Sequence, residues 1–220
     1  MATTTLKRPH EVCTAFERSY AGRASLFGRR PSPWVADVVG RPGAAGKTAL
    51  DVGCGHGRNT LHLARMGFDV AAVDVSGAAI RQLGRRASRE GLKVRTLLAD
   101  VRGLPLCPSS YDVVVAVTVL GLLDAVALAR VAERIQTSLR PGGMLLVEEF
   151  SRLDPGCSGR GRASEFAGLT RHYFDPADIR GLFGSLRAVA CGQALVADRS
   201  HGRPHSHGLI RYAARKPACT

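Results

Sequence analysis

Apolar runs alternate with amphipathic stretches along most of the chain, and this pattern predicts strands that alternate with helices. The run from Tyr111 to Leu120 is apolar apart from Asp112 and Thr118, as expected for a strand buried on both faces. Such an alternation is typical of a parallel sheet with right-handed crossovers. The predicted strands end near Val52, Asp74, Leu98, Leu120 and Val147, and the predicted helices between them span residues 59–66, 77–91 and 124–139.

The two ends of the chain depart from this alternation. Residues 1–40 contain two short predicted helices around a proline-rich loop, and we expect them to form a helical lid on a single domain of residues 41–220. After a predicted turn at residues 140–143 and the fifth strand, residues 151–170 show no clear period and are predicted to be an insertion or loop. A helix that begins near Asp175 and two closing strands, predicted to pair as an antiparallel hairpin, complete the domain.

A glycine-rich turn follows the first predicted strand and reads Asp51-Val52-Gly53-Cys54-Gly55-His56-Gly57. Glycine tolerates positive φ and lets a ligand approach the backbone, so the strand, turn and helix predict a cradle for a ligand. The spacing differs from the dinucleotide pattern G-x-G-x-x-G, because Arg58 stands where its third glycine would fall. The turn therefore argues against a pyrophosphate-containing nicotinamide cofactor.

Carboxylates end each of the first three predicted strands: Asp51, Asp74 and Asp100. In open α/β sheets ligands bind beyond the carboxyl ends of the strands. Asp74 lies at the distance along the chain from the glycine turn that is expected of a ribose-binding carboxylate. A carboxylate there can accept hydrogen bonds from both ribose hydroxyls. Asp100 is predicted to accept from an adenine amino group, with Val75 and Val101 on either side of the ring.

The pattern D-x-G-x-G-x-G resembles motif I of class I S-adenosyl-L-methionine (SAM) methyltransferases. Over nearly its full length the chain is similar to the tellurite-resistance (TehB-like) small-molecule methyltransferases. The resemblance implies a Rossmann-like sheet, mostly parallel with an antiparallel last strand and with helices on both faces. The chain departs from the family pattern at residues 151–170 and in a histidine-rich hairpin near residue 201. The matching segments are residues 27–33, 50–63, 73–76, 118–120 and 205–216.

The resemblance also implies the cofactor, SAM, and its product, S-adenosyl-L-homocysteine. In the family the acidic residue before the glycines serves the methionine amino group, directly or through water, and Asp51 matches that residue. The predicted cofactor-binding residues are Asp51, Gly53, Cys54, Gly55, Gly57, Asn59, Asp74, Val75, Asp100, Val101 and Val117.

Catalytic residues are harder to assign, because methyl transfer depends mainly on positioning. His172, Tyr173 and Tyr20 are predicted as substrate-side groups that could serve an oxygen or nitrogen acceptor as a base. A thiolate would need no base, and a basic pocket would attract it. Other candidate bases are His56, Glu148, Glu149, His201, His205 and His207, and the arginines expected to make the pocket basic are Arg29, Arg30 and Arg171.

The chain carries a net charge of +13, which raises an RNA-directed methyltransferase as the alternative to a small-molecule enzyme. Amino-directed nucleic-acid enzymes carry an Asn/Asp-Pro-Pro-aromatic motif after the fourth strand, whereas this chain has Thr118-Val119-Leu120-Gly121. The basic residues are scattered and few aromatics lie among them, which is a poor match to a base-stacking surface. We therefore expect a small-molecule substrate. A SAM-binding protein without catalysis is a third hypothesis.

Metal binding and membrane insertion are not predicted. None of the six cysteines forms a C-x-x-C pair, and only Asp198 stands near the histidines of residues 201–207 as a possible further ligand. No secretory signal and no apolar run of about 18 residues is present, so we expect a cytoplasmic monomer or homodimer. Detoxification or natural-product biosynthesis would suit the family resemblance.

Overall fold

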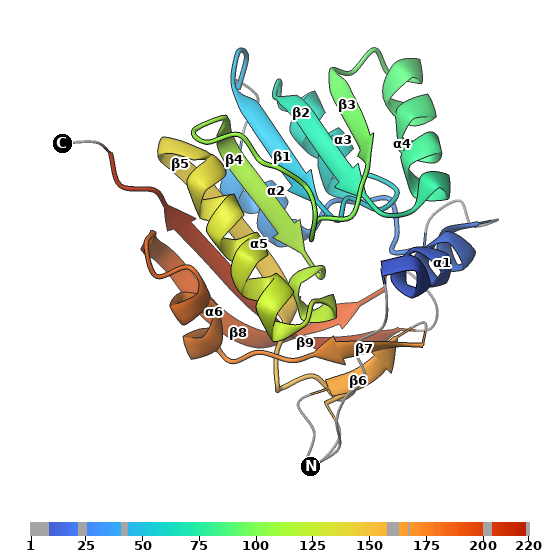
Figure 1. The fold of residues 1–220 in the computed structure, drawn as a ribbon, viewed down its shortest axis with the longest axis vertical. Helices are drawn as coiled ribbons and strands as arrows, with labels where there is room; N and C mark the ends of the chain where they lie inside the picture. The colour runs from blue at the N-terminus through green and yellow to red at the C-terminus, as the bar shows by residue number, and fades with distance from the viewer. Residues whose placement is uncertain are drawn as a thin grey trace.

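The computed structural model describes residues 9–21, 26–40, 44–157, 163–166, 168–199 and 204–218. Its centre is a seven-stranded sheet in the order β3-β2-β1-β4-β5-β9-β8 (Figure 1). Strands β1 to β5 are parallel, and β9 is antiparallel to both β5 and β8, which confirms the predicted fold class. The strands are β1 Thr48–Val52, β2 Asp69–Asp74, β3 Val94–Leu98, β4 Tyr111–Val117, β5 Leu139–Phe150, β8 Arg187–Asp198 and β9 His205–Arg215.

Helices cover both faces of this sheet, and each buries an apolar stripe against it. On one face lie α2 (Pro33–Val39), α3 (Arg58–Arg65) and α4 (Gly77–Arg89). On the other face lie α5 (Ala125–Ser138) and α6 (Pro176–Leu182). No helix among the described residues is long and apolar enough to cross a bilayer.

Short polar residues fix where the crossover helices begin. The Asp124 carboxylate accepts hydrogen bonds from the N–H groups of Val126 and Ala127, and the Ser76 hydroxyl accepts one from Ala79. These bonds satisfy N–H groups that have no partner within a helix, so both helices begin directly at the end of a strand or loop. Helix α6 begins with a capping box in which Asp175 and Asp178 each accept from the other's backbone N–H.

Several predicted boundaries differ from the structure. Strand β4 ends at Val117 rather than Leu120, because Thr118 has a φ of 54° and turns the chain into a short 3₁₀-helix, Leu120–Leu122. The turn predicted at residues 140–143 lies within β5. Gly142 has a φ of 77°, and hydrogen bonds of 2.9 Å with Lys216 hold this irregular part of the strand to the end of β9.

Residues 151–170, predicted to be an insertion or loop, contain a small antiparallel hairpin instead. Its strands are β6 (Ala163–Phe166) and β7 (Leu169–His172), which pair in the register Ala163↔His172 to Phe166↔Leu169. The tip of the hairpin is a glycine, Gly168, with a φ of 73°. The hairpin lies beyond the carboxyl-terminal edge of the large sheet (Figure 1).

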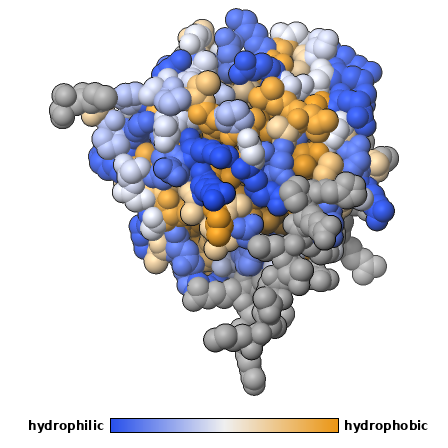
Figure 2. Space-filling model, viewed as in Figure 1, coloured by the Kyte–Doolittle hydropathy of each residue, from blue (hydrophilic) through white to orange (hydrophobic). Residues whose placement is uncertain are grey.

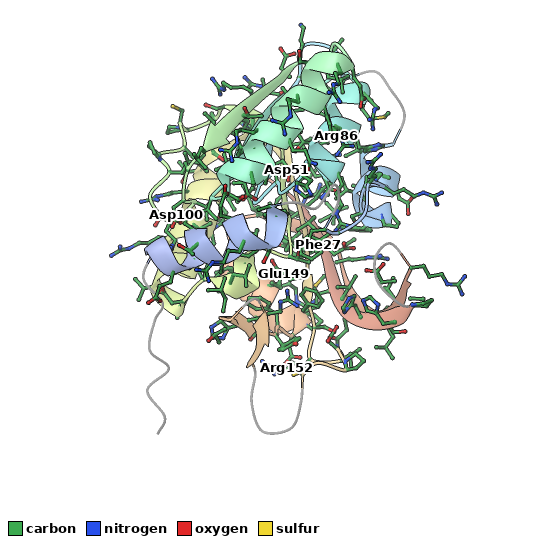
Figure 3. All side chains as sticks on the ribbon, turned by 90° about the vertical axis from the view of Figure 1, so that its right-hand side faces the viewer. Phe27, Asp51, Arg86, Asp100, Glu149 and Arg152 are labelled. Carbon is green, nitrogen blue, oxygen red and sulfur yellow. The ribbon has the colours of Figure 1, made fainter. Side chains whose placement is uncertain are left out.

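The last two strands also extend past that edge. Pairing of β5 with β9 stops at Phe150↔Leu209, whereas pairing of β8 with β9 continues to Asp198↔His205. The overhanging ribbon therefore forms a wall at the carboxyl ends of the parallel strands. The remaining helix, α1 (Pro9–Tyr20), lies across the same edge (Figure 3).

Candidate functional site

A cavity of about 880 Å³ opens at the carboxyl-terminal edge of the sheet. Helix α1 and the loop at residues 27–33 lie over it, the glycine turn and the strand ends form its floor, and the β8–β9 ribbon forms a side wall. This is the place where open α/β sheets bind their ligands. Its lining includes Phe16, Tyr20, Arg29, Arg30, Gly53, Cys54, Gly55, His56, Asn59, Asp74, Val75, Asp100, Val101, Val117, Thr118, Glu148, Phe150, Arg171, Asp198, His205, His207 and Arg211.

The glycine turn approaches three different neighbours. A Cβ on Gly53 would lie 2.6 Å from a Val119 methyl, and one on Gly55 would lie 2.6 Å from the Tyr20 hydroxyl. Both of these glycines line the cavity, as predicted for cofactor-binding residues. Gly57 is not among the described lining residues, and a Cβ there would overlap a methyl of Leu83 in α4, so its smallness serves helix packing.

Asp74 ends β2 inside the cavity, and the backbone fixes its carboxylate. The N–H of Gly55 donates to one oxygen at 2.8 Å and the N–H of Ser76 donates to the other at 2.9 Å. A carboxylate offers about four lone-pair positions, so two remain for hydroxyl donors. Burial raises the pKa of Asp74, and the two backbone hydrogen bonds partly oppose this rise.

Asp51 lies deeper than predicted. Its side chain is 2% exposed, accepts a hydrogen bond from the Thr60 hydroxyl at 2.5 Å, and is not among the described residues that line the cavity. Burial raises its pKa to about 7. Direct contact with a methionine amino group would therefore require a rearrangement or an intervening water, and the assigned role stays a prediction.

Most of the other predicted cofactor residues do reach the cavity wall, although two have partners already. Both carboxylate oxygens of Asp100 bind the Arg102 guanidinium. Burial opposes ionisation of Asp100, but these bonds outweigh it and lower its pKa. The Asn59 amide oxygen accepts from the N–H of Ser32 at 2.9 Å and so ties the covering loop to α3. The apolar members of the set that line the cavity are Val75, Val101 and Val117.

Tyr20, predicted as a substrate-side group, lies over the glycine turn. Its ring packs 4.6 Å from the His56 ring, centroid to centroid, and 6.1 Å from that of Phe16. Burial raises the pKa of Tyr20 well above its usual value and lowers that of His56. The phenol therefore keeps its proton at neutral pH, which suits a hydrogen-bonding or covering role better than that of a base.

His172 and Tyr173, predicted as the catalytic pair, are absent from the described cavity wall. His172 neighbours Arg171 in β7, and successive side chains of a strand point to opposite sides, so Arg171 takes the cavity side. Tyr173 is 4% exposed and its ring packs 6.3 Å from that of Phe150. The sequence did not predict the β6–β7 hairpin. Without its strands, the side to which the side chains of residues 171–173 point could not be predicted.

The end of the cavity far from the glycine turn is basic and aromatic. The Arg171 guanidinium stacks over the Phe150 ring at 4.2 Å, and Arg211 donates from Nε to Glu148 at 2.9 Å. Glu149 points away from the cavity, where burial raises its pKa to about 7 and the N–H of Leu120 donates to it at 2.5 Å. The described lining holds seven arginines against four carboxylates, so an anion would be attracted into this cavity.

Sequence reasoning missed Arg211 and Phe150 at this end, and Thr118 elsewhere on the cavity wall. Arg211 lies opposite Glu148 in the β5–β9 pairing, so its position required a strand register that the sequence does not state. Thr118 did carry a signal, since it belongs to the segment that resembles the methyltransferases. Its φ of 54° is rare for a β-branched residue and marks a strained turn on the cavity wall.

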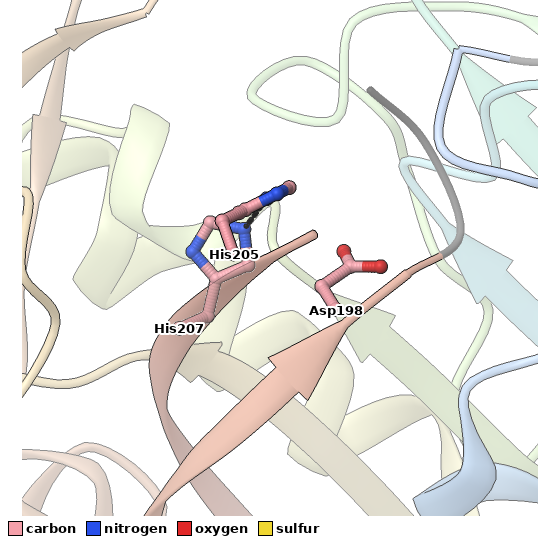
Figure 4. A group of neighbouring side chains, drawn as sticks. All are labelled: Asp198, His205 and His207. Atoms are coloured by element: carbon pink, nitrogen blue, oxygen red, sulfur yellow. Dashed lines mark hydrogen bonds between the residues drawn. The ribbon is translucent and has the colours of Figure 1, made fainter. Parts of the chain in front are cut away.

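Three side chains of the histidine-rich hairpin meet at the cavity, although no metal was predicted. The ligand atoms of Asp198, His205 and His207 all lie within 4.8 Å of one another (Figure 4). His201, also named from the sequence, lies outside the described residues.

Comparisons with known proteins agree with this geometry. Residues 49–143 match the family described as "Methyltransferase domain". The chain is 37% identical over 109 residues to "Hemagglutinin 1" of Eikenella corrodens, covering 49% of this chain and 36% of that protein. It is 31% identical over 109 residues to "Probable S-adenosyl-L-methionine-dependent methyltransferase TehB" of Haemophilus influenzae, covering 49% and 38%. The chain thus spans less than two fifths of the length of these relatives.

A solved structure shares the fold over a longer stretch. It is the 1,6-didemethyltoxoflavin-N1-methyltransferase of Burkholderia thailandensis, bound to 1,6-didemethyltoxoflavin and S-adenosylhomocysteine. The TM-score is 0.69 at 22% identity, covering 96% of this chain and 92% of that one. At this identity the likeness shows the fold.

Proposed function

We propose that the chain carries a class I SAM-dependent methyltransferase domain, supported by the family match at residues 49–143 and the similarity to TehB, and that it methylates a small anionic acceptor. The observation that carries the proposal is the composition of one cavity. At one end the glycine turn and Asp74 suit an adenosyl cofactor, and at the other end Arg171, Phe150 and Arg211 suit an anionic small molecule.

The residues at the cofactor end offer the hydrogen-bond acceptors and apolar contacts that SAM requires. Asp74 is held by Gly55 and Ser76 with acceptor positions left for ribose hydroxyls, and Val75 and Val101 offer apolar contact for a purine. When bound, SAM supplies a methyl group activated on a sulfonium sulfur. The residues of this chain would hold it, cover it with Phe16 and Tyr20, and keep water out. Such positioning can contribute on the order of 7–11 kcal/mol to catalysis.

The acceptor end favours a nucleophile that arrives already ionised, such as a thiolate. His172 and Tyr173 are not among the described lining residues, and Tyr20 lines the cavity but keeps its proton, so these three predicted bases are poorly suited to deprotonate an acceptor hydroxyl. Arg171 and Arg211 would attract and orient an anion instead. The finer assignment to sulfur or another chalcogen, in detoxification or natural-product biosynthesis, rests on this argument.

A substrate panel tests the acceptor. Small thiols, phenols and carboxylates are incubated with SAM and the protein, and the products are identified by mass spectrometry. We expect thiols to be methylated, Arg171→Ala to raise KM for an anionic acceptor about tenfold, and His172→Ala to leave turnover near that of the unmodified protein. The matched control is Arg152→Ala, since Arg152 pairs with Asp178 at 2.9 Å, outside the described cavity wall. Inert thiols together with a hydroxyl substrate that fails in His172→Ala would overturn the assignment.

RNA remains the alternative acceptor because of the charge. Contacts to phosphates make binding fall steeply with salt. We expect no salt-sensitive retention of RNA on filters. Tight retention at low salt, with RNA methylation and no small-molecule turnover, would favour the RNA-directed interpretation.

A further inference from the structure

The hairpin formed by β8 and β9 places two histidines and a carboxylate on one side of its overhanging end. Asp198 is the cross-strand partner of His205, and His207 follows two residues later, so all three side chains share a face. Figure 4 shows the two imidazoles in contact on β9 with the Asp198 carboxylate beside them on β8. The three residues also line the cavity.

The distances are close to those of a metal site. The Nε2 atoms of His205 and His207 are 2.9 Å apart, and every pair of ligand atoms in the cluster lies within 4.8 Å. Ligands at the 2.0–2.2 Å typical of zinc stand ~3.3 Å apart in a tetrahedral site. The imidazoles thus need to separate by only a few tenths of an ångström, and the Asp198 oxygen, at most 4.8 Å from either nitrogen, would need to approach by up to about 1.5 Å.

A buried carboxylate orients one of the imidazoles from behind. Asp154 is 7% exposed, and its Oδ2 lies 3.0 Å from Nδ1 of His207. The N–H groups of Gly208 and Gly156 donate to the same carboxylate at 3.0 and 2.8 Å. With a proton on Nδ1 directed to Asp154, Nε2 of His207 presents its lone pair toward His205 and Asp198. Metal-binding histidines characteristically have such a carboxylate partner.

We propose that Asp198, His205 and His207 bind one zinc ion whose remaining coordination position faces the acceptor end of the cavity. Two histidines and one carboxylate leave the fourth position of a tetrahedral zinc open, as in catalytic zinc sites. The charges of Asp154 and Asp198 offset that of the ion, and Arg211, further along β9, is paired with Glu148. That the open position takes the heteroatom of the acceptor rests on the proposed function, whereas zinc binding itself does not.

The site is tested with the untagged full chain stripped of metal by a chelator. Zinc binding is measured by calorimetry, and cobalt(II) is added as a spectroscopic probe. We expect one ion per chain and the intense visible bands of four-coordinate cobalt. Asp198→Asn and His207→Ala should each abolish these bands, and Asp154→Asn should weaken zinc binding about 10- to 100-fold.

Two controls separate this site from other sources of binding. His62→Gln changes a histidine on α3, and Cys107→Ser removes an exposed thiol; both should bind zinc and cobalt as the unmodified protein does. Urea unfolding midpoints establish that each variant is folded. Absence of the cobalt bands, or bands that persist in His207→Ala and vanish in Cys107→Ser, would leave only a hydrogen-bonded histidine pair and overturn the proposal.

The open position has its own test. Adding a small monothiol to the cobalt-loaded protein should produce a sulfur-to-cobalt charge-transfer band in the near ultraviolet. Cobalt bound at the site without this band would overturn the open position. The readout needs neither SAM nor turnover, so its failure is distinct from failure of the proposed methyl transfer.

Discussion

The glycines of the turn illustrate how differently three similar residues can be constrained. Gly53, Gly55 and Gly57 all have positive φ, but the neighbours that a Cβ would meet are Val119, Tyr20 and Leu83. Spacing alone predicted a ligand-binding role for all three. Only the packing of α4 on α3 shows that Gly57 serves the core.

Gly57→Ala should therefore destabilise the fold. A Cβ at this left-handed position costs about 1–2 kcal/mol in conformation, and the overlap with Leu83 adds about 1–3 kcal/mol. The free energy of unfolding in urea measures the loss. Gly46→Ala is the matched control, because Gly46 has nearly the same φ, 78°, and a Cβ added there would meet nothing within 4 Å. Equal losses in the two variants would contradict the packing argument.

Two buried carboxyls should make the stability of the cofactor-free protein depend on pH. Burial raises the pKa of Asp51 from 3.8 and that of Glu149 from 4.5, each to about 7. Between these limits the folded protein holds protons that the unfolded chain releases, so stability falls as pH rises from about 4 to 7. Each group contributes up to about 1.4 kcal/mol per pH unit.

Unfolding in urea at pH 5 and pH 8 measures this dependence. Asp51→Asn and Glu149→Gln keep an oxygen that accepts from Thr60 and Leu120, and each should reduce the loss of stability between the two pH values. Asp69→Asn, at the exposed start of β2, is the control and should not. Variants whose pH dependence parallels that of the unmodified protein would contradict the assignment.

At the scale of elements, the Glu17 carboxylate is one of the groups that hold α1 over the cavity, beside the packing of Phe16 and Tyr20. Glu17 accepts from the Ser76 hydroxyl at 2.6 Å and from the N–H of Ala78 at 2.9 Å, and it pairs with Arg81 at 3.2 Å. These contacts join α1 to the positive N-terminal end of α4, next to Asp74. The hydrogen bonds from Ala78 and Ser76 lower the pKa of Glu17. Helix α1 belongs to the segment predicted as a lid, and that role stays a prediction.

Glu17→Ala should loosen this attachment. We expect faster hydrogen exchange at residues 11–20 with little change in β4, because α1 packs on the edge of the molecule rather than in its core. Arg18→Ala, on the exposed side of the same helix, is the control.

Adding S-adenosylhomocysteine to the unmodified protein should protect residues 13–34 from hydrogen exchange, since a closing segment becomes ordered. Equal protection with and without it would make α1 a static packing element.

The elements also show which part of the structure the sequence could predict. Alternating apolar segments and capping residues were sufficient for β1–β4, for the crossover helices and for the closing hairpin. The β6–β7 hairpin was missed because four-residue strands leave no measurable period. Without that hairpin the sequence could not show which way His172 and Tyr173 face, and the position of Arg211 on the cavity wall depends on the β5–β9 register, which the sequence does not show.

For the whole molecule, the structure shows where part of the net charge of +13 lies. Figure 2 shows hydrophilic and hydrophobic residues interspersed on one face of the molecule, with no single polar area dominating it. Part of the positive charge lies inside the cavity, where arginines outnumber carboxylates among the described lining residues. Charge so placed favours a small anion over an extended nucleic acid, which agrees with the proposed acceptor.

We expect the glycine turn and Asp74 to bind an adenosyl methyl donor, and calorimetric titration with S-adenosylhomocysteine measures that binding. We expect micromolar affinity, and a loss of roughly 1–3 kcal/mol in Asp74→Ala, the cost of removing hydrogen bonds to a charged group. Asp69→Ala, at the opposite end of the same strand, should bind as the unmodified protein does. Tight binding of NAD without binding of S-adenosylhomocysteine, or an Asp74→Ala variant of unchanged affinity, would contradict the account.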